Sequence, residues 1–260
     1  MLRNKLSEYS QVFAVGDIHG CKDLLDNIHH QIIKASKNKE GQKLIIYLGD
    51  YVDRGPDIKG TIQTLIDFNP PHFKKIFLLG NHEQMLLEFI SESRNSPFVW
   101  IYNGGSKTLE SYGMELSNNI DDTMDLTIDK KFRKKFNDLI PKSHMDFFNQ
   151  LIINYTWKDY FFVHAGINPD IPLSMQERET MLWTREKHFF KPTMKYEKII
   201  VHGHTPKEKI EKFPYRINID TGSFYSGNLS CLLIENEKLS FIDTFIISSP
   251  AHNPSSDPKF

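Results

Sequence analysis

The chain is built from short apolar runs that each end in a polar, glycine-containing cluster. The runs lie at residues 11–15, 44–48, 75–79, 160–163, 198–201 and 216–219, and the clusters that follow them read GDIHG, GDYVDRG, GNHE, HAG, HGHTP and DTGS. Runs of this length and composition are typical of buried β-strands. After each of the first three, apolar residues recur at a spacing near 3.6, over 23–35, 58–68 and 84–90, which predicts helices. Strands that alternate with helices predict a layered α/β architecture.

The polar clusters all follow the carboxyl ends of predicted strands. Open α/β sheets bind their ligands at this edge, because the loops that leave parallel strands meet there. We therefore expect side chains from distant parts of the chain to converge on one site.

The residue types in these clusters are those that bind divalent metal ions. Asp17 and His19 are separated by one residue, so an extended backbone would point both to the same side. The other candidate ligands end other predicted strands: Asp50, Asn81, His164 and either His202 or His204. A mixed oxygen and nitrogen set without thiolates suits a pair of manganese, iron or zinc ions. Two such cations, about 3.5–4 Å apart, would acidify a bridging water and clamp the oxygens of a displacement at phosphorus.

The ordered motifs resemble the phosphoprotein phosphatase family of binuclear metallophosphoesterases. The resemblance spans residues 11–235 and rests on GDIHG at 16–20, GDYVDRG at 49–55, GNHE at 80–83, HAG at 164–166 and GHTP at 203–206. Trp100 with NGG at 103–105, WTR at 183–185 and DTG at 220–222 are similar to the compact bacterial and phage serine/threonine protein phosphatases. The resemblance implies an α/β, calcineurin-like metallophosphoesterase fold, which is a central β-sandwich flanked by helices.

The resemblance also assigns the metal ligands by position. It implies that Asp17 and His19 bind the first metal, that Asp50 bridges, and that the second metal is bound by Asn81, His164 and His204. The choice of His204 rests on the GHTP pattern, and His202 stays in reserve because strand alternation would put both rings on one side. The implied cofactors are two divalent cations, with Mn²⁺ expected first and iron or zinc as alternatives.

His82 and Asp53 resemble the acid pair of that family. An aspartate hydrogen-bonded to imidazole favours the protonated ring, which can protonate a departing alkoxide. Arg54 and Arg185 resemble its phosphate-binding arginines, since a planar guanidinium can hold two phosphoryl oxygens. The implied function is hydrolysis of phosphoserine and phosphothreonine in a phosphoprotein or phosphopeptide, with phosphotyrosine as a further monoester. The implied mechanism is direct attack of a metal-bridging hydroxide, without a covalent enzyme intermediate.

Two alternatives stay open at this point. The same core is used by symmetric bis(5′-nucleosyl)-tetraphosphatases, whose substrate is a dinucleoside polyphosphate, and residues 113–151 would then have to form a nucleoside pocket. A catalytically silent binding protein would be expected to have lost a ligand or the acid, and this chain retains all of them.

The composition argues against other classes of partner. The chain has 32 basic and 33 acidic residues, which gives a net charge of −1 and no general attraction to nucleic acid. The basic run 130–135 follows Asp125 and Asp129 at helical spacing, so we interpret it as a solvated helix face. No apolar stretch is long enough to span a bilayer. We expect no membrane or nucleic-acid partner and a cytoplasmic location.

The two cysteines, Cys21 and Cys231, are expected to be reduced, and no CxxxxxR loop marks Cys21 as a nucleophile. We expect one metallophosphoesterase domain over 1–247 and a flexible proline- and serine-rich tail over 248–260. A hairpin is predicted from the strands 228–234 and 238–245 around a turn at 235–237.

Overall fold

A computed structural model describes residues 9–91, 97–114, 130–189 and 195–244. The predicted tail and part of the middle segment, residues 115–129, lie outside these ranges. The strands are β1 (Gln11–Val15), β2 (Lys43–Tyr47), β3 (Phe73–Phe77), β4 (Asn154–Trp157), β5 (Tyr160–Val163), β6 (Ile199–His202), β7 (Glu211–Phe213), β8 (Arg216–Asn218), β9 (Ser230–Glu235) and β10 (Lys238–Asp243). The α-helices are α1 (Lys22–Ala35), α2 (Ile58–Asp67), α3 (Asn81–Ser91), α4 (Pro97–Trp100), α5 (Ser106–Ser111), α6 (Lys130–Leu139), α7 (Lys142–Asn149), α8 (Arg178–Trp183), α9 (Glu186–Phe189) and α10 (Ser223–Ser226). A π-helical turn, η1 (Ile101–Gly105), joins α4 to α5, and a 3₁₀ turn, η2 (Leu173–Met175), precedes α8.

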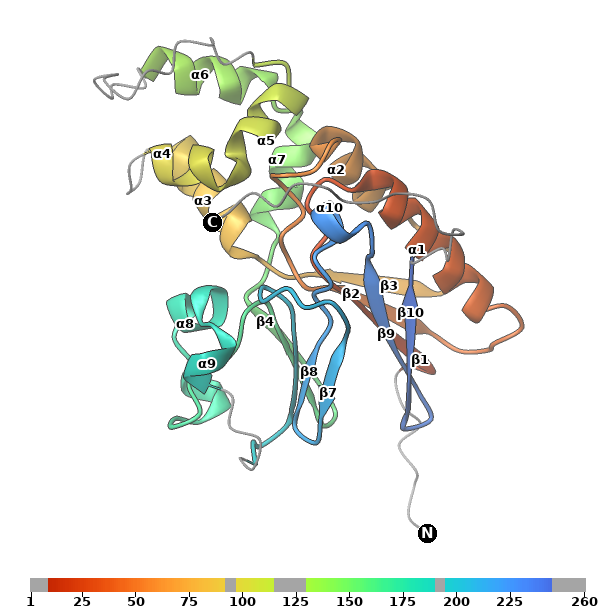
Figure 1. The fold of residues 1–260 in the computed structure, drawn as a ribbon. Coiled ribbons are helices and arrows are strands. Elements are labelled where there is room, and N and C mark those ends of the chain that lie inside the picture. The colour runs from red at the N-terminus through yellow and green to blue at the C-terminus, as the bar shows by residue number, and fades with distance from the viewer. Residues whose placement is uncertain (1–8, 92–96, 115–129, 190–194, 245–260) are drawn as a thin grey trace, which may run out of the picture.

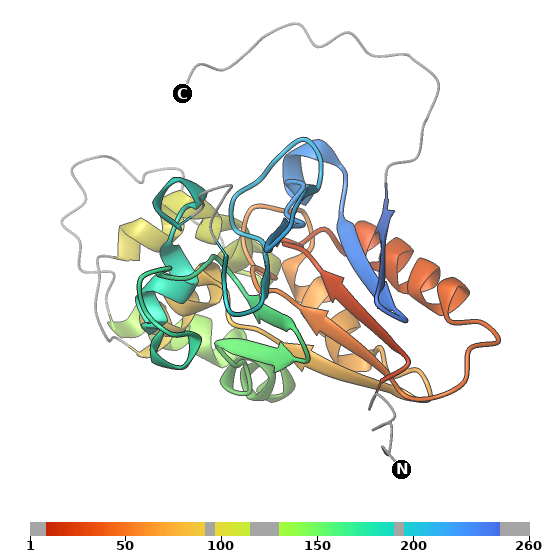
Figure 2. The same ribbon diagram turned by 90° about the horizontal axis from the view of Figure 1, so that it is seen from below.

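Within the described ranges the strands form two five-stranded sheets, ordered β10-β9-β1-β2-β3 and β4-β5-β6-β8-β7. The neighbours β1, β2 and β3 are parallel, as are β5, β6 and β8. Figures 1 and 2 show α1 and α2 along the outer side of the first sheet and α8 and α9 beside the second. The carboxyl ends of both parallel sets carry the polar clusters.

Side-chain alternation along β1 shows how the two sheets pack. Phe13 and Val15 point into a large apolar cluster with residues of α1, α2, α3 and α7. Val12 and Ala14 point the other way and pack with Phe162 and other residues of the second sheet. Because successive strand residues face opposite sides, β1 separates a helix-covered layer from a layer between the sheets. The predicted β-sandwich flanked by helices is confirmed.

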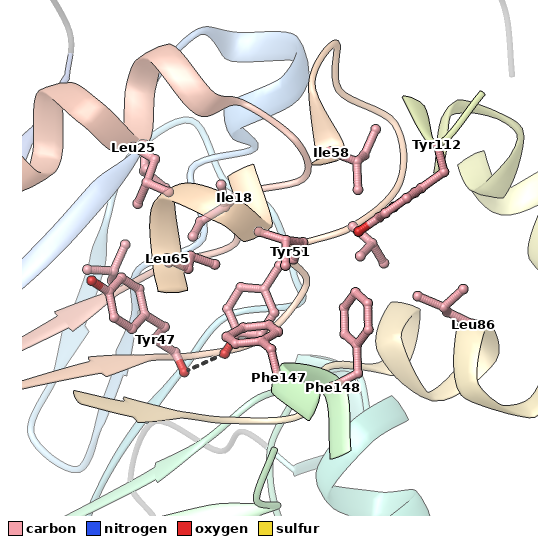
Figure 3. Close-up of a cluster of buried hydrophobic side chains, with 14 of the residues drawn as sticks. Ile18, Leu25, Tyr47, Tyr51, Ile58, Leu65, Leu86, Tyr112, Phe147 and Phe148 are labelled. Atoms are coloured by element: carbon pink, nitrogen blue, oxygen red, sulfur yellow. Dashed lines mark hydrogen bonds between the residues drawn. The ribbon is translucent and has the colours of Figure 1, made fainter. Parts of the chain in front are cut away.

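Tyr51 anchors the loop after β2 to the core beneath the site. Its ring is buried among apolar side chains, including Phe147 of α7 (Figure 3). Its hydroxyl donates hydrogen bonds to the carbonyl oxygens of Tyr47, over 3.2 Å, and Leu78, over 2.7 Å. A buried phenol needs such acceptors. The tyrosine therefore connects the ends of β2 and β3 and fixes the loop that carries Asp50.

The predicted helix at 84–90 begins three residues earlier, at Asn81. The polar residues of the GNHE motif interrupt the apolar periodicity, which conceals the first turn of α3. Asn81 and His82 therefore extend from a helix terminus and not from a simple strand-end turn. This placement gives both side chains a rigid support.

Two further predictions fall close to the observed structure. The hairpin is formed by β9 and β10, and its turn is Asn236–Glu237, with φ of 48° and 64° at the two residues. Positive φ at both positions suits a two-residue hairpin turn, which is shorter than the predicted one. The basic run forms the first part of α6, where Lys134 is exposed and pairs with Asp138, so the interpretation as a solvated face is confirmed there.

No helix in the described ranges is long and apolar enough to cross a membrane. Cys21 and Cys231 are both buried and free, as expected.

Candidate metal and phosphate site

A cavity of about 120 Å³ lies where the polar clusters converge. It is lined by Asp17, His19, Asp50, Arg54, Asn81, His82, Asn103, Trp183, Arg185, His204, Pro206, Asp220, Gly222 and Phe224. Two of the predicted site residues, Asp53 and His164, do not line it. Both are fully buried behind it: Asp53 is hydrogen-bonded to His82, and His164 Nε2 lies 2.9 Å from Asn81 Oδ1. The structure thus brings all the predicted ligands, the acid pair and both arginines together.

Five of the predicted site residues have a left-handed backbone. The φ angle lies between 46° and 70° at His19, Asp50, Asp53, Arg54 and His204. Such a conformation costs a non-glycine residue roughly 1–2 kcal/mol, and strain of this kind concentrates at functional sites. It also turns the chain sharply at each cluster, so the side chains face the cavity from folded loops and not from extended strand ends.

The first predicted metal position is surrounded by acceptor atoms that face one another. His19 Nδ1 lies 2.8 Å from the carbonyl oxygen of Val52, so Nδ1 carries the proton and Nε2 presents a lone pair. That lone pair faces Asp50 Oδ2 at 3.4 Å. Asp17 Oδ1 is buried and has no hydrogen-bond partner. Acceptors turned toward one another without a shared proton are unfavourable unless a cation lies among them.

The second predicted position repeats this arrangement. His164 Nδ1 donates to the carbonyl oxygen of Leu48 over 2.9 Å, which leaves Nε2 facing Asp50 Oδ1 at 3.3 Å and Asn81 Oδ1 at 2.9 Å. His204 Nδ1 also lies 2.9 Å from Asn81 Oδ1. Asp50 therefore faces both clusters, one through each carboxylate oxygen. The donor set fits a pair of divalent cations that share Asp50.

The ionisation of these groups is consistent with that fit. Burial lowers the pKa of His19 to about 3 and that of His204 to about 2, and it also lowers the pKa of His164. The rings are therefore neutral, which is the form that binds metal. Burial, together with the neighbouring Asp220 and Asp50 carboxylates, raises the pKa of Asp17. A bound cation would offset this crowding of negative charge.

His202 lies outside the site although it is buried. Its Nε2 accepts a hydrogen bond from Arg216 Nε over 2.9 Å, and its Nδ1 lies 2.9 Å from the carbonyl oxygen of Gly203. β6 ends at His202, and the left-handed turn at His204 breaks the alternation that would have put both rings on one side. The expectation of a common side is wrong, and the geometry favours His204.

His82 and Asp53 form a buried pair, with Nδ1 and Oδ2 separated by 2.6 Å. Burial by itself lowers the pKa of His82, but the Asp50 and Asp53 carboxylates outweigh it and raise that pKa above its ordinary value. The opposite ring atom, Nε2, lies 3.0 Å from an Arg54 guanidinium nitrogen. This edge of the ring faces the cavity, where a proton can be given to a bound substrate.

The two arginines reach the cavity from opposite parts of the chain. Arg54 is packed over the ring of Phe224, with its guanidinium carbon 4.9 Å from the ring centre. Arg185 donates from Nη1 to the carbonyl oxygen of His204 over 2.6 Å. Two residues before Arg185, Trp183 Nε1 donates a hydrogen bond to Gln84 Oε1 over 2.9 Å. This bond connects the Arg185 loop to α3, the helix that carries Asn81.

The comparison with known families agrees with this geometry. A family model described as calcineurin-like phosphoesterase matches residues 10–232. The chain belongs to the calcineurin-like phosphoesterase family. The expected fold class, and the expectation of a metallophosphoesterase enzyme, are thereby confirmed.

The relatives of this calcineurin-like phosphoesterase include proteins with two kinds of name. Serine/threonine-protein phosphatase 2 of Salmonella typhimurium is 29% identical over 87% of this chain and 94% of its own length. Bis(5′-nucleosyl)-tetraphosphatase PrpE [asymmetrical] of Oceanobacillus iheyensis is 24% identical over 85% of this chain and 87% of its own. A solved serine/threonine phosphatase from Saccharomyces cerevisiae has the same fold, with a TM-score of 0.55 and 14% sequence identity. The match covers 95% of this chain and 83% of the yeast chain.

Glu83 is a residue of this calcineurin-like site that sequence reasoning did not single out. Its carboxylate is fully buried and accepts hydrogen bonds from the backbone N–H groups of Asp50, Tyr51, Val52 and Gly80. It therefore holds the Asp50 loop against the start of α3. Its place in the GNHE motif was the available signal, but nothing in the local pattern indicates its partners.

Asp220 was also not predicted, although it lies in the DTG motif. It lines the cavity, and burial raises its pKa to about 7. Its Oδ1 accepts from the backbone N–H of Gly222 over 2.9 Å, which orients the turn that carries Phe224.

Proposed function

We propose that this calcineurin-like phosphoesterase hydrolyses phosphoserine and phosphothreonine monoesters in proteins, and phosphotyrosine as a further monoester. The observation that carries the proposal is the size of the cavity between the arginines and the predicted ligands. About 120 Å³ accommodates a phosphoryl group, whereas pockets that enclose a drug-sized ligand measure roughly 300–1,000 Å³. A phosphorylated side chain can insert its phosphoryl group while the rest of the substrate stays outside.

The proposed ligands are Asp17, His19, Asp50, Asn81, His164 and His204, and the proposed ions are Mn²⁺, with iron or zinc as alternatives. Bound divalent cations would supply an acidified water and would neutralise charge on the phosphoryl oxygens. Val52 and Leu48 fix the tautomers of His19 and His164 through their carbonyl oxygens, so each ring presents its lone pair to the site.

The other residues act on the phosphoryl group and on the leaving oxygen. Arg54 and Arg185 orient the phosphoryl group and offset the charge that grows on its oxygens. A proton on His82 Nε2 is transferred to the departing alkoxide, and Asp53 stabilises the protonated ring through Nδ1. Occupation of the cavity by an anion would draw the Arg54 guanidinium away from Nε2, which frees that atom to hold the proton.

Dinucleoside tetraphosphate hydrolysis is the second candidate, and the names of the PrpE relatives favour it, although those names are of asymmetrical enzymes and the sequence resemblance implied a symmetric one. The catalytic atoms do not discriminate between a phosphomonoester and a phosphoanhydride, since both need the same clamp on phosphorus. The small cavity argues against dinucleotide hydrolysis, because the cavity offers no enclosed space for a nucleoside among its lining residues. We also propose a cytoplasmic location, which the two free cysteines support.

A side-by-side hydrolysis assay tests the function. Protein loaded with Mn²⁺ is given a phosphoserine peptide or diadenosine tetraphosphate, and the two kcat/KM values are compared, with Asp50→Asn as the control. A higher value for the peptide and an inactive variant would support the proposal. A higher value for the dinucleotide would overturn the substrate while leaving the metal mechanism in place. Inactivity on both substrates, combined with a measurement of the metal content per chain, would identify a catalytically silent binding protein.

A further inference from the structure

The segment 97–111, which comprises α4, η1 and α5, contributes two hydrogen-bond donors to Asp53. Trp100 Nε1 donates to both carboxylate oxygens, over 3.1 Å to Oδ1 and 3.0 Å to Oδ2. The Thr108 hydroxyl donates to Oδ1 over 2.5 Å and accepts from the backbone N–H of Asp53 over 3.0 Å. With His82 on Oδ2, each oxygen of the carboxylate is held by two donors.

These contacts are buried and rigidly supported. Asp53 and Thr108 are fully buried, and Trp100 is 2% exposed. The indole packs on Phe89, with ring centres 4.7 Å apart. Gly105 allows the chain to return over the indole, because a Cβ there would lie 2.6 Å from the ring. Low exposure removes competing water, so the carboxylate cannot rotate without losing hydrogen bonds.

We propose that Trp100 and Thr108 are positioning residues that hold the Asp53 carboxylate toward His82 Nδ1. Neither touches the cavity, so both act through Asp53 and His82. The proposal rests on the proposed role of His82 as proton donor to the leaving oxygen. Without both donors the carboxylate can turn toward its remaining partner, and the imidazole loses its fixed orientation.

The leaving group of the substrate separates this role from a general structural one. A serine alkoxide needs a proton to depart, whereas a nitrophenolate does not, because it is a far weaker base. Loss of orientation at His82 should therefore slow hydrolysis of a phosphoserine peptide but not of p-nitrophenyl phosphate. A general distortion of the site would slow both reactions equally.

The experiment compares Thr108→Val and Trp100→Phe with the wild type, all loaded with Mn²⁺. For the phosphoserine peptide we expect kcat to fall about tenfold and KM to change less than about twofold. A general acid contributes roughly 10²–10⁴-fold to the rate, so this fall in kcat corresponds to a partial loss of that contribution. For p-nitrophenyl phosphate we expect a change of less than about twofold. Thr108→Ser keeps the hydroxyl and should restore the peptide rate. Thr61→Val is the matched control, since Thr61 is a fully buried threonine of α2 bonded to Asp57.

A measurement without substrate makes the test independent of the proposed function. The proton on His82 Nδ1, in its short hydrogen bond to Asp53, should give a downfield NMR signal that shifts or broadens in Thr108→Val and Trp100→Phe. Equal losses on both substrates, no loss on the peptide, or an unchanged signal would each overturn the positioning role. A wild type that does not hydrolyse the peptide would overturn the proposed function alone, because the signal reports on Asp53 directly.

Discussion

Glu83 Oε2 accepts a hydrogen bond of 2.8 Å from the backbone N–H of Asp50. The same carboxylate is bonded to three further backbone N–H groups, so one side chain organises the loop after β2 and the loop before α3. The loop after β2 carries the predicted ligand Asp50, and the loop before α3 leads directly into the predicted ligand Asn81. The stability of the fold and the geometry of the site therefore depend on the same group.

Glu83→Gln should be strongly destabilising. The amide NH₂ would face backbone N–H donors, and a buried donor without an acceptor costs about 1–3 kcal/mol. We expect the free energy of unfolding to fall by about 3 kcal/mol in urea titrations. Glu88→Gln, on the same helix but only partly buried, is the matched control and should change it by less than about 0.5 kcal/mol. Similar values for the two variants would contradict this role.

Substitutions at the two neighbouring histidines should have different effects on metal binding. His204 lines the cavity, and His202 is bonded to Arg216 behind it. We expect His204→Ala to bind about one metal ion fewer per chain when metal content is measured after loading. His202→Gln should retain the wild-type metal content while lowering the unfolding temperature, because the buried Arg216 contact is altered. Loss of metal from the His202 variant only would reverse the assignment.

Arg185→Lys should impair catalysis although it preserves the charge. Nη1 of Arg185 is bonded to the carbonyl oxygen of His204, and the planar group still presents other donors to the cavity. An ammonium cannot make both sets of contacts, so we expect kcat/KM for a phosphoserine peptide to fall at least tenfold, or about 1.4 kcal/mol. The exposed Arg178→Lys in α8 serves as control. An unchanged kcat/KM for Arg185→Lys would remove this residue from the proposed site.

His29 should make the fold sensitive to acid independently of the site. Its ring is buried, stacked on Phe68 at 3.6 Å, and within 2.8 Å of the Tyr47 hydroxyl, and burial lowers its pKa from 6.5 to about 3. The unfolded chain binds a proton below pH 6.5 and the folded chain does not, so the stabilisation is complete above pH 6.5 and is lost as the pH falls toward 3.

Between pH 7 and pH 5 this difference corresponds to about 2 kcal/mol of unfolding free energy. Urea titrations at pH 7 and at pH 5 give the unfolding free energy at each pH. From pH 7 to pH 5 we expect this free energy to fall by about 2 kcal/mol less in His29→Gln than in the wild type. His30→Gln, at the exposed neighbouring position, is the control. If the unfolding free energy of the His29 variant falls between pH 7 and pH 5 by as much as that of the wild type, this ring does not account for the acid sensitivity.

Local patterns were sufficient to predict eight of the ten strands in the described residues, the clusters that follow them and the residue types of a metal site, whereas β4 and β7 were not predicted. Strand and helix periodicity depend on near neighbours, and turn residues mark where each strand ends, so β1, β5 and α2 were found close to their observed bounds. The start of α3 was missed because the polar GNHE residues have no apolar periodicity, and only the packed helix shows that Asn81 lies in its first turn.

The sequence by itself determined which chemical groups this chain brings to the carboxyl ends of its strands, because their order and spacing follow from local structure. Only the tertiary structure decided which of those groups meet. The left-handed turn at His204 selects that ring over His202, and Trp100 and Thr108 reach Asp53 across 47 and 55 residues. Such contacts result from how the layers pack, and packing over these separations leaves no periodic signal in the chain.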